Sequence, residues 1–429
     1  MRSRVNARFV LRIVPPAKKQ KGCISVKIRN NFNHTVYASF LGYAVQAIIN
    51  NFAPLLFLTF QSTYSISLDK IALLVTINFG IQLVVDLLAS KFVDKIGYRV
   101  SIVSAHLFAG IGLVGLTVFP EWFSDPYIGL LIAIAVYAVG GGLIEVLISP
   151  IVEACPTERK EATMSLLHSF YCWGHVFVVL ASTLFFFLFG IENWKILALI
   201  WAVVPLLNAL YFTQVPLRTL TGESEGLGLR KLVRMKAFWL LLLLMMCAGA
   251  CEQSVSQWAS TFAESGLGVS KAIGDLAGPC AFAALMGSAR VFYAKFSEKI
   301  NLQSFMLLSG GLCLVSYLLV SLVPIPLIGL IGCGLCGLSV GILWPGTFSI
   351  AAKEIRAGGT AMFAFLALAG DLGCLGGPTF VGFISGAFED NLRVGLFAAV
   401  IFPLLLIAGL FIFRLMKRRT EKTAIEPAV

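Results

Sequence analysis

Four acidic residues stand inside long apolar stretches of this sequence, where charged side chains are otherwise rare: Asp86, Glu145, Glu252 and Asp371. Placing one charged side chain at the centre of a lipid bilayer costs roughly 2.5–3.5 kcal/mol on insertion scales. Acidic residues that are retained despite this cost are therefore candidates for a functional site. The chemistry that suits them is the uptake and release of protons, because a carboxyl group that has lost its hydration favours the protonated form.

Further polar residues accompany these acids at helical spacing. Gln46 and Asn50 lie about one helical turn apart, and Glu252 shares a helix face with Ser256. Trp258 is a candidate platform for stacking a sugar ring, although a tryptophan near a membrane interface also serves as an anchor. For His168, Glu252 and Asp371, a hydrogen bond to the backbone or to a neighbouring helix remains an open alternative. The candidate substrate-binding residues are Gln46, Asn50, Asn51, His168, Glu252, Trp258 and Asp371.

The composition places these residues in a membrane protein. Of the 429 residues, 58% are hydrophobic and only 13% are charged, whereas roughly a quarter of the residues of a soluble domain are charged. Apolar stretches of about 20 residues are long enough for a helix to cross a bilayer. The expected spans are 35–60, 69–92, 100–120, 127–154, 161–189, 194–214, 237–263, 272–296, 303–323, 325–352, 358–388 and 393–415. The sequence therefore predicts an all-α polytopic membrane protein with 12 transmembrane helices.

The basic residues alternate between the two sides of the predicted membrane. Of the 33 Lys and Arg residues, 28 fall on the side that contains both termini, and four fall on the opposite side: Lys70, Lys195, Lys271 and Arg393. The positive-inside rule then places both termini in the cytoplasm of a multi-pass protein of the plasma or inner membrane. This topology also explains the net charge of +11, so no nucleic-acid partner is expected. The tail 1–34 lacks the apolar run of a cleavable signal peptide.

Two short sequence motifs each occur twice, about half the chain length apart. "KFVDKIG" (91–97) matches "KFSEKIN" (295–301), and "GLIEVLISP" (142–150) matches "GLSVGILWP" (337–345). Two matches at similar offsets indicate two related halves, as in duplicated transporters with a binding site between the repeats. The predicted domains are a basic tail 1–34, a six-helix bundle 35–214, a central loop 215–236, a second six-helix bundle 237–415 and a tail 416–429.

The repeated charged motif, "KFVDKIG" and "KFSEKIN", suggests a gating loop in each half. Such a loop mixes acids and bases, which can hold neighbouring helices together through charge-assisted hydrogen bonds. Simple anchoring by positive charge is the alternative, but it explains only the basic residues. The candidates are Asp86, Asp94, Lys95, Gly97 and Arg99 in the first half, and Lys295, Glu298 and Lys299 in the second. For Asp86, the alternative roles are to cap this loop or to form a hydrogen bond with a neighbouring helix.

The stretch "SKFVDKIGYR" (90–99) resembles the signature loop of the major facilitator superfamily. That signature reads roughly Gly-x-x-x-Asp-Arg/Lys-x-Gly-x-Arg/Lys, and this chain supplies Asp94, Lys95, Gly97 and Arg99, with Ser90 in place of the first glycine. The resemblance covers the whole chain in span number, halves and position of the termini. It implies two pseudo-symmetric six-helix bundles that rock about a central binding site.

A second stretch, "GGGLIEVLISPIVEACP", resembles the fucose-permease-like branch of this superfamily, which includes sugar–proton symporters. The branch carries a fourth-helix pattern close to Glu-x-x-x-Asn-Pro-Phe-Val, and this chain has Glu145, Ser149, Pro150, Ile151 and Val152. The resemblance implies that Glu145 couples transport to protons. The first-helix aspartate of the fucose transporter is missing, because Asn50 and Asn51 stand nearest to its position.

These observations favour a secondary active transporter of a small polar solute, with a sugar as the leading substrate class. We find no phosphate-binding loop for ATP and no His-Glu-x-x-His or Cys/His metal motif. One charge moving down 100 mV releases about 2.3 kcal/mol, so one proton suffices to drive uptake. No cofactor is expected, sodium coupling stays open, and a monomer in the lipid bilayer is the expected unit. The alternatives are a proton-driven drug or metabolite efflux carrier and, outside transport, a membrane sensor or an intramembrane enzyme.

Overall fold

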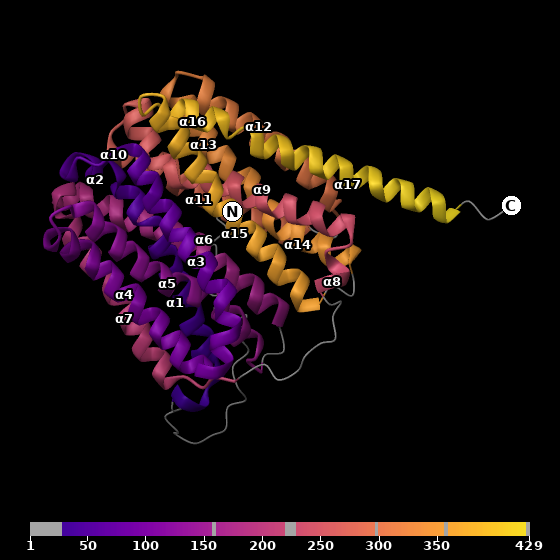
Figure 1. The fold of residues 1–429 in the computed structure, drawn as a ribbon, viewed down its shortest axis with the longest axis horizontal. Helices are drawn as coiled ribbons and strands as arrows, with labels where there is room; N and C mark the ends of the chain where they lie inside the picture. The colour runs from indigo at the N-terminus through magenta and orange to yellow at the C-terminus, as the bar shows by residue number, and fades with distance from the viewer. Residues whose placement is uncertain (1–27, 157–159, 219–228, 297–298, 356–358, 426–429) are drawn as a thin grey trace, which may run out of the picture.

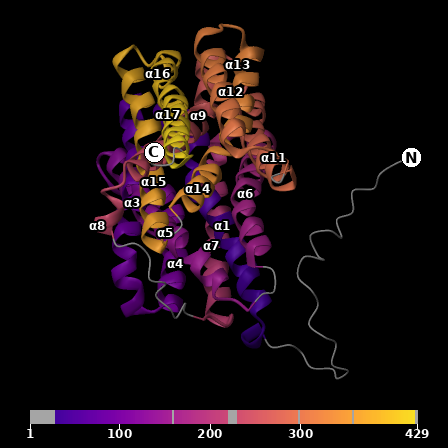
Figure 2. The ribbon, with the colours of Figure 1, turned by 90° about the vertical axis from the view of Figure 1, so that its right-hand side faces the viewer.

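The structure is a computed structural model that describes residues 28–156, 160–218, 229–296, 299–355 and 359–425. Within these ranges the regular secondary structure is helical, without strands. Twelve segments there are long and apolar enough to cross a membrane, as the sequence predicts, and most of their ends lie within a few residues of the predicted ends. The first six and the last six form two bundles that occupy different parts of the molecule in both views (Figures 1 and 2).

The first bundle runs from α1 to α7. Asn31 starts α1 by accepting a hydrogen bond from the Asn33 backbone at 2.9 Å, and Asp125 starts α5 in the same way. The elements are α1 (Phe32–Asn51), the 3-10 turn η3 (Ala53–Leu56), α2 (Phe57–Tyr64), α3 (Leu68–Ile96), α4 (Tyr98–Trp122), α5 (Pro126–Glu153), α6 (Lys160–Phe189) and α7 (Trp194–Gln214). Together α1, η3 and α2 form the first membrane span.

The second bundle is more interrupted. Its elements are α8 (Leu229–Leu232), α9 (Lys236–Thr261), the π turn η5 (Phe262–Gly266), α10 (Lys271–Asp275), the π turn η6 (Leu276–Cys280), α11 (Ala281–Phe296), α12 (Leu302–Leu322), α13 (Pro326–Val340), α14 (Leu343–Glu354), α15 (Gly359–Ala387), α16 (Leu392–Ala398) and α17 (Ile401–Ile425). The structure breaks the helix within the eighth, tenth and twelfth spans. In addition, α17 continues to Ile425, past the predicted end at 415, and projects away from the bundle (Figure 1).

Four prolines account for the helix breaks. A proline has no backbone N–H, and its ring clashes with the carbonyl of the residue four positions earlier. In the first bundle, α1 ends at Asn51, one residue after the position four residues before Pro54. The ends of α10, α13 and α16 lie within one residue of the positions four residues before Pro279, Pro345 and Pro403. Pro150 and Pro378 instead lie inside continuous helices, as lipid-embedded helices allow.

Glycines allow helices to pack closely within each bundle. A Cβ atom on Gly112 of α4 would collide with the Tyr137 backbone of α5, and one on Gly373 of α15 would collide with the Met246 carbonyl of α9. Small residues at such crossings let helix backbones approach in a membrane, where the hydrophobic effect does not drive helix association. The pairs α4–α5 and α9–α15 are the closest partnerships within their bundles.

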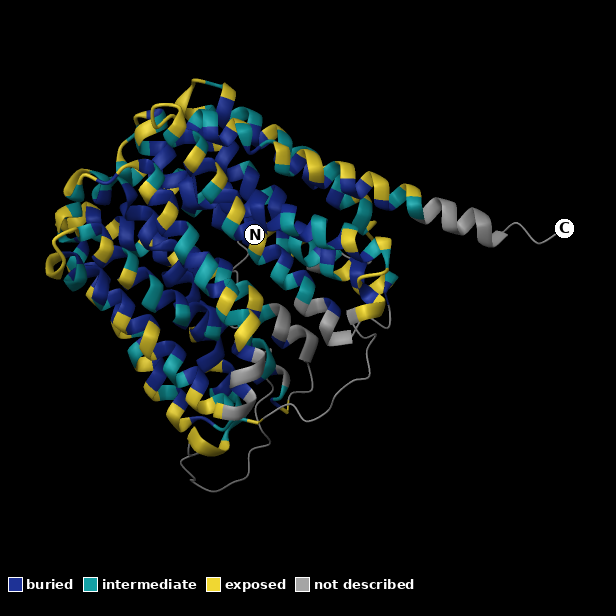
Figure 3. Ribbon diagram, viewed as in Figure 1, coloured by how far each residue is buried: buried dark blue, intermediate teal, exposed yellow. Residues whose placement is uncertain are grey.

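The outward-facing side chains are large and apolar. Phe187, Leu308 and Leu327 are each at least 66% exposed, and exposed residues cover the perimeter of the molecule (Figure 3). A soluble protein rarely exposes contiguous apolar surface of this extent. The perimeter is therefore the surface that faces lipid, and the chain is an integral multi-pass membrane protein.

The two ends of the bundles differ in how the halves meet. We call the end where α1 starts and α17 finishes the tail end, and the opposite end, which carries α2 and α10, the far end. The halves contact each other along α3–α15 and α6–α11, and at the far end η3 and α6 also contact α9 and α10. The ribbons of the halves lie together at the far end and diverge toward the tail end (Figure 1). The described conformation is closed at the far end.

Candidate functional site

A network of side-chain amides joins three helices of the first bundle. Gln46 of α1 donates from its Nε2 atom to Gln82 Oε1 of α3 at 2.9 Å and to Glu145 Oε2 of α5 at 3.2 Å. Asn50 Oδ1 accepts from Asn78 Nδ2 at 3.2 Å and from Gln82 Nε2 at 2.9 Å. These four amide side chains are all buried, and buried polar groups need partners of this kind. The network therefore holds the Glu145 carboxyl group in a defined position.

Three carboxyl groups gather where the halves meet. Glu145 of α5, Asp86 of α3 and Asp371 of α15 are half-buried and interact electrostatically with one another. The Asp86 and Asp371 carboxyl groups face each other across the boundary between the halves. Two ionised carboxylates in this position repel one another, so a proton on either group favours the contact. Asp86 is thus a membrane-embedded residue that faces a helix of the other half, and it lies outside the gating loop in which it was predicted.

Hydroxyl and imidazole groups lie beside Glu145. Tyr43 of α1 places its hydroxyl group 3.2 Å from Ser149 Oγ and 3.4 Å from His168 Nδ1. The His168 side chain is exposed, although it belongs to a predicted membrane span. On the same helix as His168, the Tyr171 side chain of α6 lies beside Asn50 and Asn51. The first bundle therefore offers several neutral donors and acceptors next to a carboxyl group.

The second bundle contributes an acid–base pair. Arg290 of α11 places an NH2 atom 3.6 Å from Glu252 Oε2 of α9 and donates from Nε to the Gly341 carbonyl at 3.2 Å. Gln253 and Gln257 connect the pair to the first bundle. Gln253 Nε2 donates to Glu252 Oε1 at 3.4 Å, and Gln257 Nε2 donates to Gln253 Oε1 at 3.0 Å and to the Asn50 carbonyl at 3.1 Å. Polar groups of both halves thus meet in one region of the membrane interior.

Trp258 has a different position from the one predicted. Its side chain is fully buried, its Nε1 atom donates to the Pro378 carbonyl at 2.9 Å, and its ring lies 5.5 Å from that of Phe57. In this conformation it is a packing residue among α2, α9 and α15, and it presents no free face to a solute. The sequence does not reveal this, because the indole N–H partner is a backbone carbonyl on a distant helix.

The structure describes only some of the side chains predicted to form the gating loops. The side chains of Asp94 and Lys95, and residue Glu298, lie outside the described residues. Positions 94 and 95 belong to the last turn of α3, so the connection to α4 is shorter than predicted and centres on Gly97, whose φ is 91°. In the second half, Lys295 and Lys299 are exposed, and the Lys295 ammonium group lies over the Phe296 ring.

Arg99 contacts its own half. It donates to the carbonyl groups of Phe212, Thr213 and Val215 at 2.7, 3.0 and 2.8 Å. A cationic side chain often satisfies the last carbonyls of a helix in this way. These contacts stabilise the end of α7 within the first bundle.

Sequence reasoning missed five residues of the polar region: Tyr43, Asn78, Gln82, Ser149 and Arg290. A signal for three of them was present. Asn78 and Gln82 precede Asp86 at steps of four residues, and Tyr43 precedes Gln46 and Asn50 at steps of three and seven. Such spacing places polar side chains on one helix face. Among the described residues, no group of three His, Cys, Asp or Glu side chains is arranged to hold a metal ion.

The fold consists of two six-helix bundles, and polar side chains from both lie in one central region. This arrangement is that of a membrane transporter of the two-bundle class. The chain belongs to the Major Facilitator Superfamily, whose family model matches residues 36–378. Members of this family transport small molecules and are generally not enzymes. No curated protein matches the chain by sequence at a significant level.

Solved structures with the same fold are distant in sequence. A bacterial homologue of the human lysosomal transporter Spinster, in an inward-facing and unoccupied conformation, is 15% identical with a TM-score of 0.71, and the match covers 89% of this chain and 96% of that chain. A D-xylose–proton symporter is 13% identical with a TM-score of 0.69, covering 88% and 95%. The Escherichia coli fucose–proton symporter FucP is 16% identical with a TM-score of 0.60, covering 88% and 98%. At these identities the likeness shows the fold.

Proposed function

We propose that this transporter takes up a small polar solute, with a sugar as the leading class, together with protons. The observation that carries the proposal is the position of Glu145, which accepts a hydrogen bond from Gln46 and faces the Asp86–Asp371 pair. In this proposal the tail end faces the cytoplasm of a cell whose plasma or inner membrane holds the protein. The proposed path lies within one chain, so a monomer is the proposed unit.

The carboxyl cluster suits proton coupling because it includes both halves. Asp86 and Glu145 belong to the first bundle and Asp371 to the second. A proton shared by Asp86 and Asp371 holds the two halves together at this point, whereas two ionised groups repel one another. In the proposed cycle, Glu145 gains or loses its proton beside this pair, so the charge that the halves present to each other changes with the proton load.

The neighbouring polar groups suit a hydroxylated solute. A sugar hydroxyl both donates and accepts hydrogen bonds, and the region offers acceptors on Glu252, donors on Arg290, and hydroxyl or imidazole groups on Tyr43, Ser149 and His168. A solute that replaces the long 3.6 Å contact between Arg290 and Glu252 would be bound by a charged donor and a charged acceptor at once. The sugar–proton symporters among the solved structures agree with this substrate class.

A second candidate is efflux of a metabolite or drug. The observation that favours it is that a homologue of the lysosomal transporter Spinster matches this fold as well as the D-xylose–proton symporter does, with TM-scores of 0.71 and 0.69, so the fold does not restrict the solute to sugars. The two candidates differ in the direction of coupled transport and in the solute, and they use the same carboxyl groups. Uptake measurements therefore separate them.

The test uses proteoliposomes that contain the purified full chain. Counterflow exchange and pH-driven accumulation are measured in the same liposomes for a panel of sugars and for a panel of apolar metabolites, with sodium gradients as separate arms. Glu145→Gln imitates the protonated side chain, so exchange of a transported solute should persist while accumulation driven by a pH gradient is lost. Glu192→Gln, at an exposed glutamate on η4 (Ile191–Asn193), is the control and should retain both activities.

Three results would overturn the proposal. If Glu145→Gln still concentrates the solute in response to a pH gradient, the proton site lies elsewhere, and Glu252 or Asp371 becomes the next candidate. Accumulation driven by a sodium gradient alone would show that sodium, and not the proton, is the coupling ion. Transport of apolar metabolites without transport of any sugar would favour the efflux candidate.

A further inference from the structure

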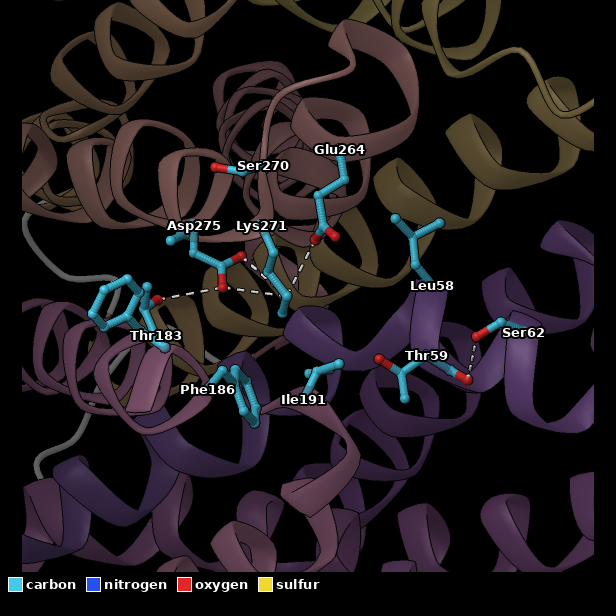
Figure 4. Close-up of a pocket in the computed structure, with 12 residues that line it drawn as sticks. Leu58, Thr59, Ser62, Thr183, Phe186, Ile191, Glu264, Ser270, Lys271 and Asp275 are labelled. Carbon is cyan, nitrogen blue, oxygen red and sulfur yellow. Dashed lines mark hydrogen bonds and ion pairs between the residues drawn. The ribbon is translucent and has the colours of Figure 1, made fainter. Parts of the chain in front are cut away.

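A cluster of charged residues joins the two halves at the far end. Lys271 opens α10, and its Nζ atom lies 3.2 Å from Glu264 Oε1 and 3.2 Å from Asp275 Oδ2 of its own half. The same Nζ atom donates to the Leu55 carbonyl of the other half at 2.6 Å. Leu55 lies in η3, at the break between α1 and α2. Figure 4 shows Lys271 between the two acids.

A second contact crosses between the halves at the same place. Asp275 is completely buried, and its carboxylate accepts hydrogen bonds from Ser260 of its own half and from Thr183 of α6, the latter at 3.3 Å. In addition, the Lys271 ammonium group lies 5.6 Å from the centre of the Phe186 ring, one turn further along α6. One ion cluster of the second bundle therefore binds both η3 and α6 of the first.

We propose that Lys271, Glu264 and Asp275 form the gate that closes the far end of this transporter. The proposal rests on alternating access by the proposed transporter and adds the residues that close one side of it. In the closed state, Lys271 binds the Leu55 carbonyl and Asp275 binds the Thr183 hydroxyl. Opening breaks these two bonds and separates η3 and α6 from α10.

The distribution of charge makes this gate reversible. A buried charge without a partner is strongly unfavourable, but Lys271 retains both carboxylates when Leu55 moves away. The first bundle contributes to these two bonds only a backbone carbonyl and a neutral hydroxyl group, and water can satisfy both after opening. No charge is therefore left unpaired in either state, and the two crossing bonds decide which state is preferred.

A cavity of about 460 Å³ lies between the halves at this cluster. Its lining includes residues of both bundles together with the three gate residues, which are labelled in Figure 4. From the first bundle come Leu58, Thr59, Thr183 and Phe186, among others. Space beside the gate gives Lys271 room to move with α10 when the halves separate.

The test measures access to a buried position near the gate, with no solute present. Ala53 of η3 is 5% exposed, and η3 packs against α9. In the purified full chain, the rate at which a maleimide reagent labels Ala53→Cys reports opening of the far end, after subtraction of labelling in the parent chain. Lys271→Met should raise this rate about three- to tenfold, which corresponds to the loss of one hydrogen bond between the halves.

The matched control is Lys70→Met. Lys70 is a lysine at the far end whose ammonium group lies over the Tyr127 ring of its own half, so its removal should change the rate less than twofold. Thr183→Val removes the other crossing bond and leaves the three charges in place, and it should raise the rate about twofold. If gel filtration and thermal denaturation show that Lys271→Met does not fold, Thr183→Val alone tests the gate.

An unchanged labelling rate in Thr183→Val and in every folded Lys271 variant would overturn the gate. An equal increase in Lys70→Met would also overturn it, because the effect would then follow from lost positive charge at the far end. The outcome is independent of the proton and the solute. If labelling rises as expected while Glu145→Gln retains pH-driven accumulation, the proposed coupling site fails and the gate stands.

Discussion

The carboxyl groups of Asp86 on α3 and Asp371 on α15 face each other across the boundary between the two bundles. Two ionised carboxylates in this position repel one another, so a proton on either group favours the contact. Glu145 of α5 faces the same pair and adds a third acidic group. The boundary between the bundles is therefore expected to be more stable when it carries a proton.

This acidic pair should make stability depend on pH in a direction that can be tested. Raising the pH removes a proton from the pair and leaves two like charges facing each other, so the thermal stability of the wild-type protein should fall between mildly acidic and alkaline pH. In Asp86→Asn the amide donates to Asp371 without a proton, and the melting temperature should depend less on pH. The difference should reach about 1.5–3 kcal/mol at alkaline pH, the range for a hydrogen bond to a charged group.

The control for this experiment is Asp69→Asn, at the far-end start of the same helix. It should retain the wild-type pH dependence. Equal pH dependence of Asp86→Asn and the wild type would show that the proton at this boundary contributes nothing to stability. Differential scanning fluorimetry of the detergent-purified protein over a pH series is a sufficient measurement.

The close packing of α9 on α15 predicts different effects for two neighbouring glycines. A Cβ atom at Gly373 would meet the Met246 carbonyl and the Ala250 backbone, whereas one at Gly376 would meet nothing within 4 Å. Gly373→Ala should therefore destabilise the protein by about 1–3 kcal/mol through overpacking. Gly376→Ala should leave stability unchanged or raise it slightly, because alanine favours helix. A larger loss for Gly376→Ala in thermal denaturation would contradict the described packing.

Arg99 should affect stability more than transport kinetics. Its guanidinium group donates three hydrogen bonds to the last carbonyls around the end of α7, and Arg99→Ala removes all three at a cost of about 1–3 kcal/mol. Arg99→Lys should recover only part of this, because an ammonium group lacks the planar fork of guanidinium. If Arg99→Ala melts like the wild type but changes the labelling rate at Ala53→Cys, Arg99 acts on the opening of the halves instead.

The orientation in the membrane can be tested at two exposed positions. Ser124 lies at the far end, between α4 and α5, and Lys299 lies at the tail end, between α11 and α12. If the tail end is cytoplasmic, a membrane-impermeant maleimide should label Ser124→Cys in intact cells and label Lys299→Cys only after lysis. The reverse pattern would place both termini outside the cytoplasm.

Much of the architecture follows from the distribution of apolar and charged residues. The number of spans follows from apolar length, and the family model and the solved structures confirm the two-bundle fold. Gln46, Asn50, Glu145, Glu252 and Asp371 share the central polar region, as their positions within apolar spans indicate. Their assignment to a solute or a proton stays a prediction.

Other features depend on contacts between distant parts of the chain. The proposed gate is an example. In the sequence, Lys271 is simply one of the few basic residues on the far side of the predicted membrane. Its partner Leu55 contributes a backbone carbonyl, which no sequence pattern reveals. The same holds for Arg99, whose acceptors are backbone carbonyls more than a hundred residues away. Sequence patterns locate polar side chains on helix faces, but they carry little information about bonds to the backbone.

The helix breaks have a consequence for how the polar region is built. Because Pro54 and Pro345 lack an N–H group, the carbonyls of Asn50 and Gly341 lack the donor four residues later that a continuous helix would supply. The Asn50 carbonyl accepts a hydrogen bond from Gln257, and the Gly341 carbonyl accepts one from Arg290. Each proline thus releases a backbone oxygen that anchors a polar side chain of another helix. The two prolines therefore provide the polar region with fixed backbone acceptors that add no side-chain charge.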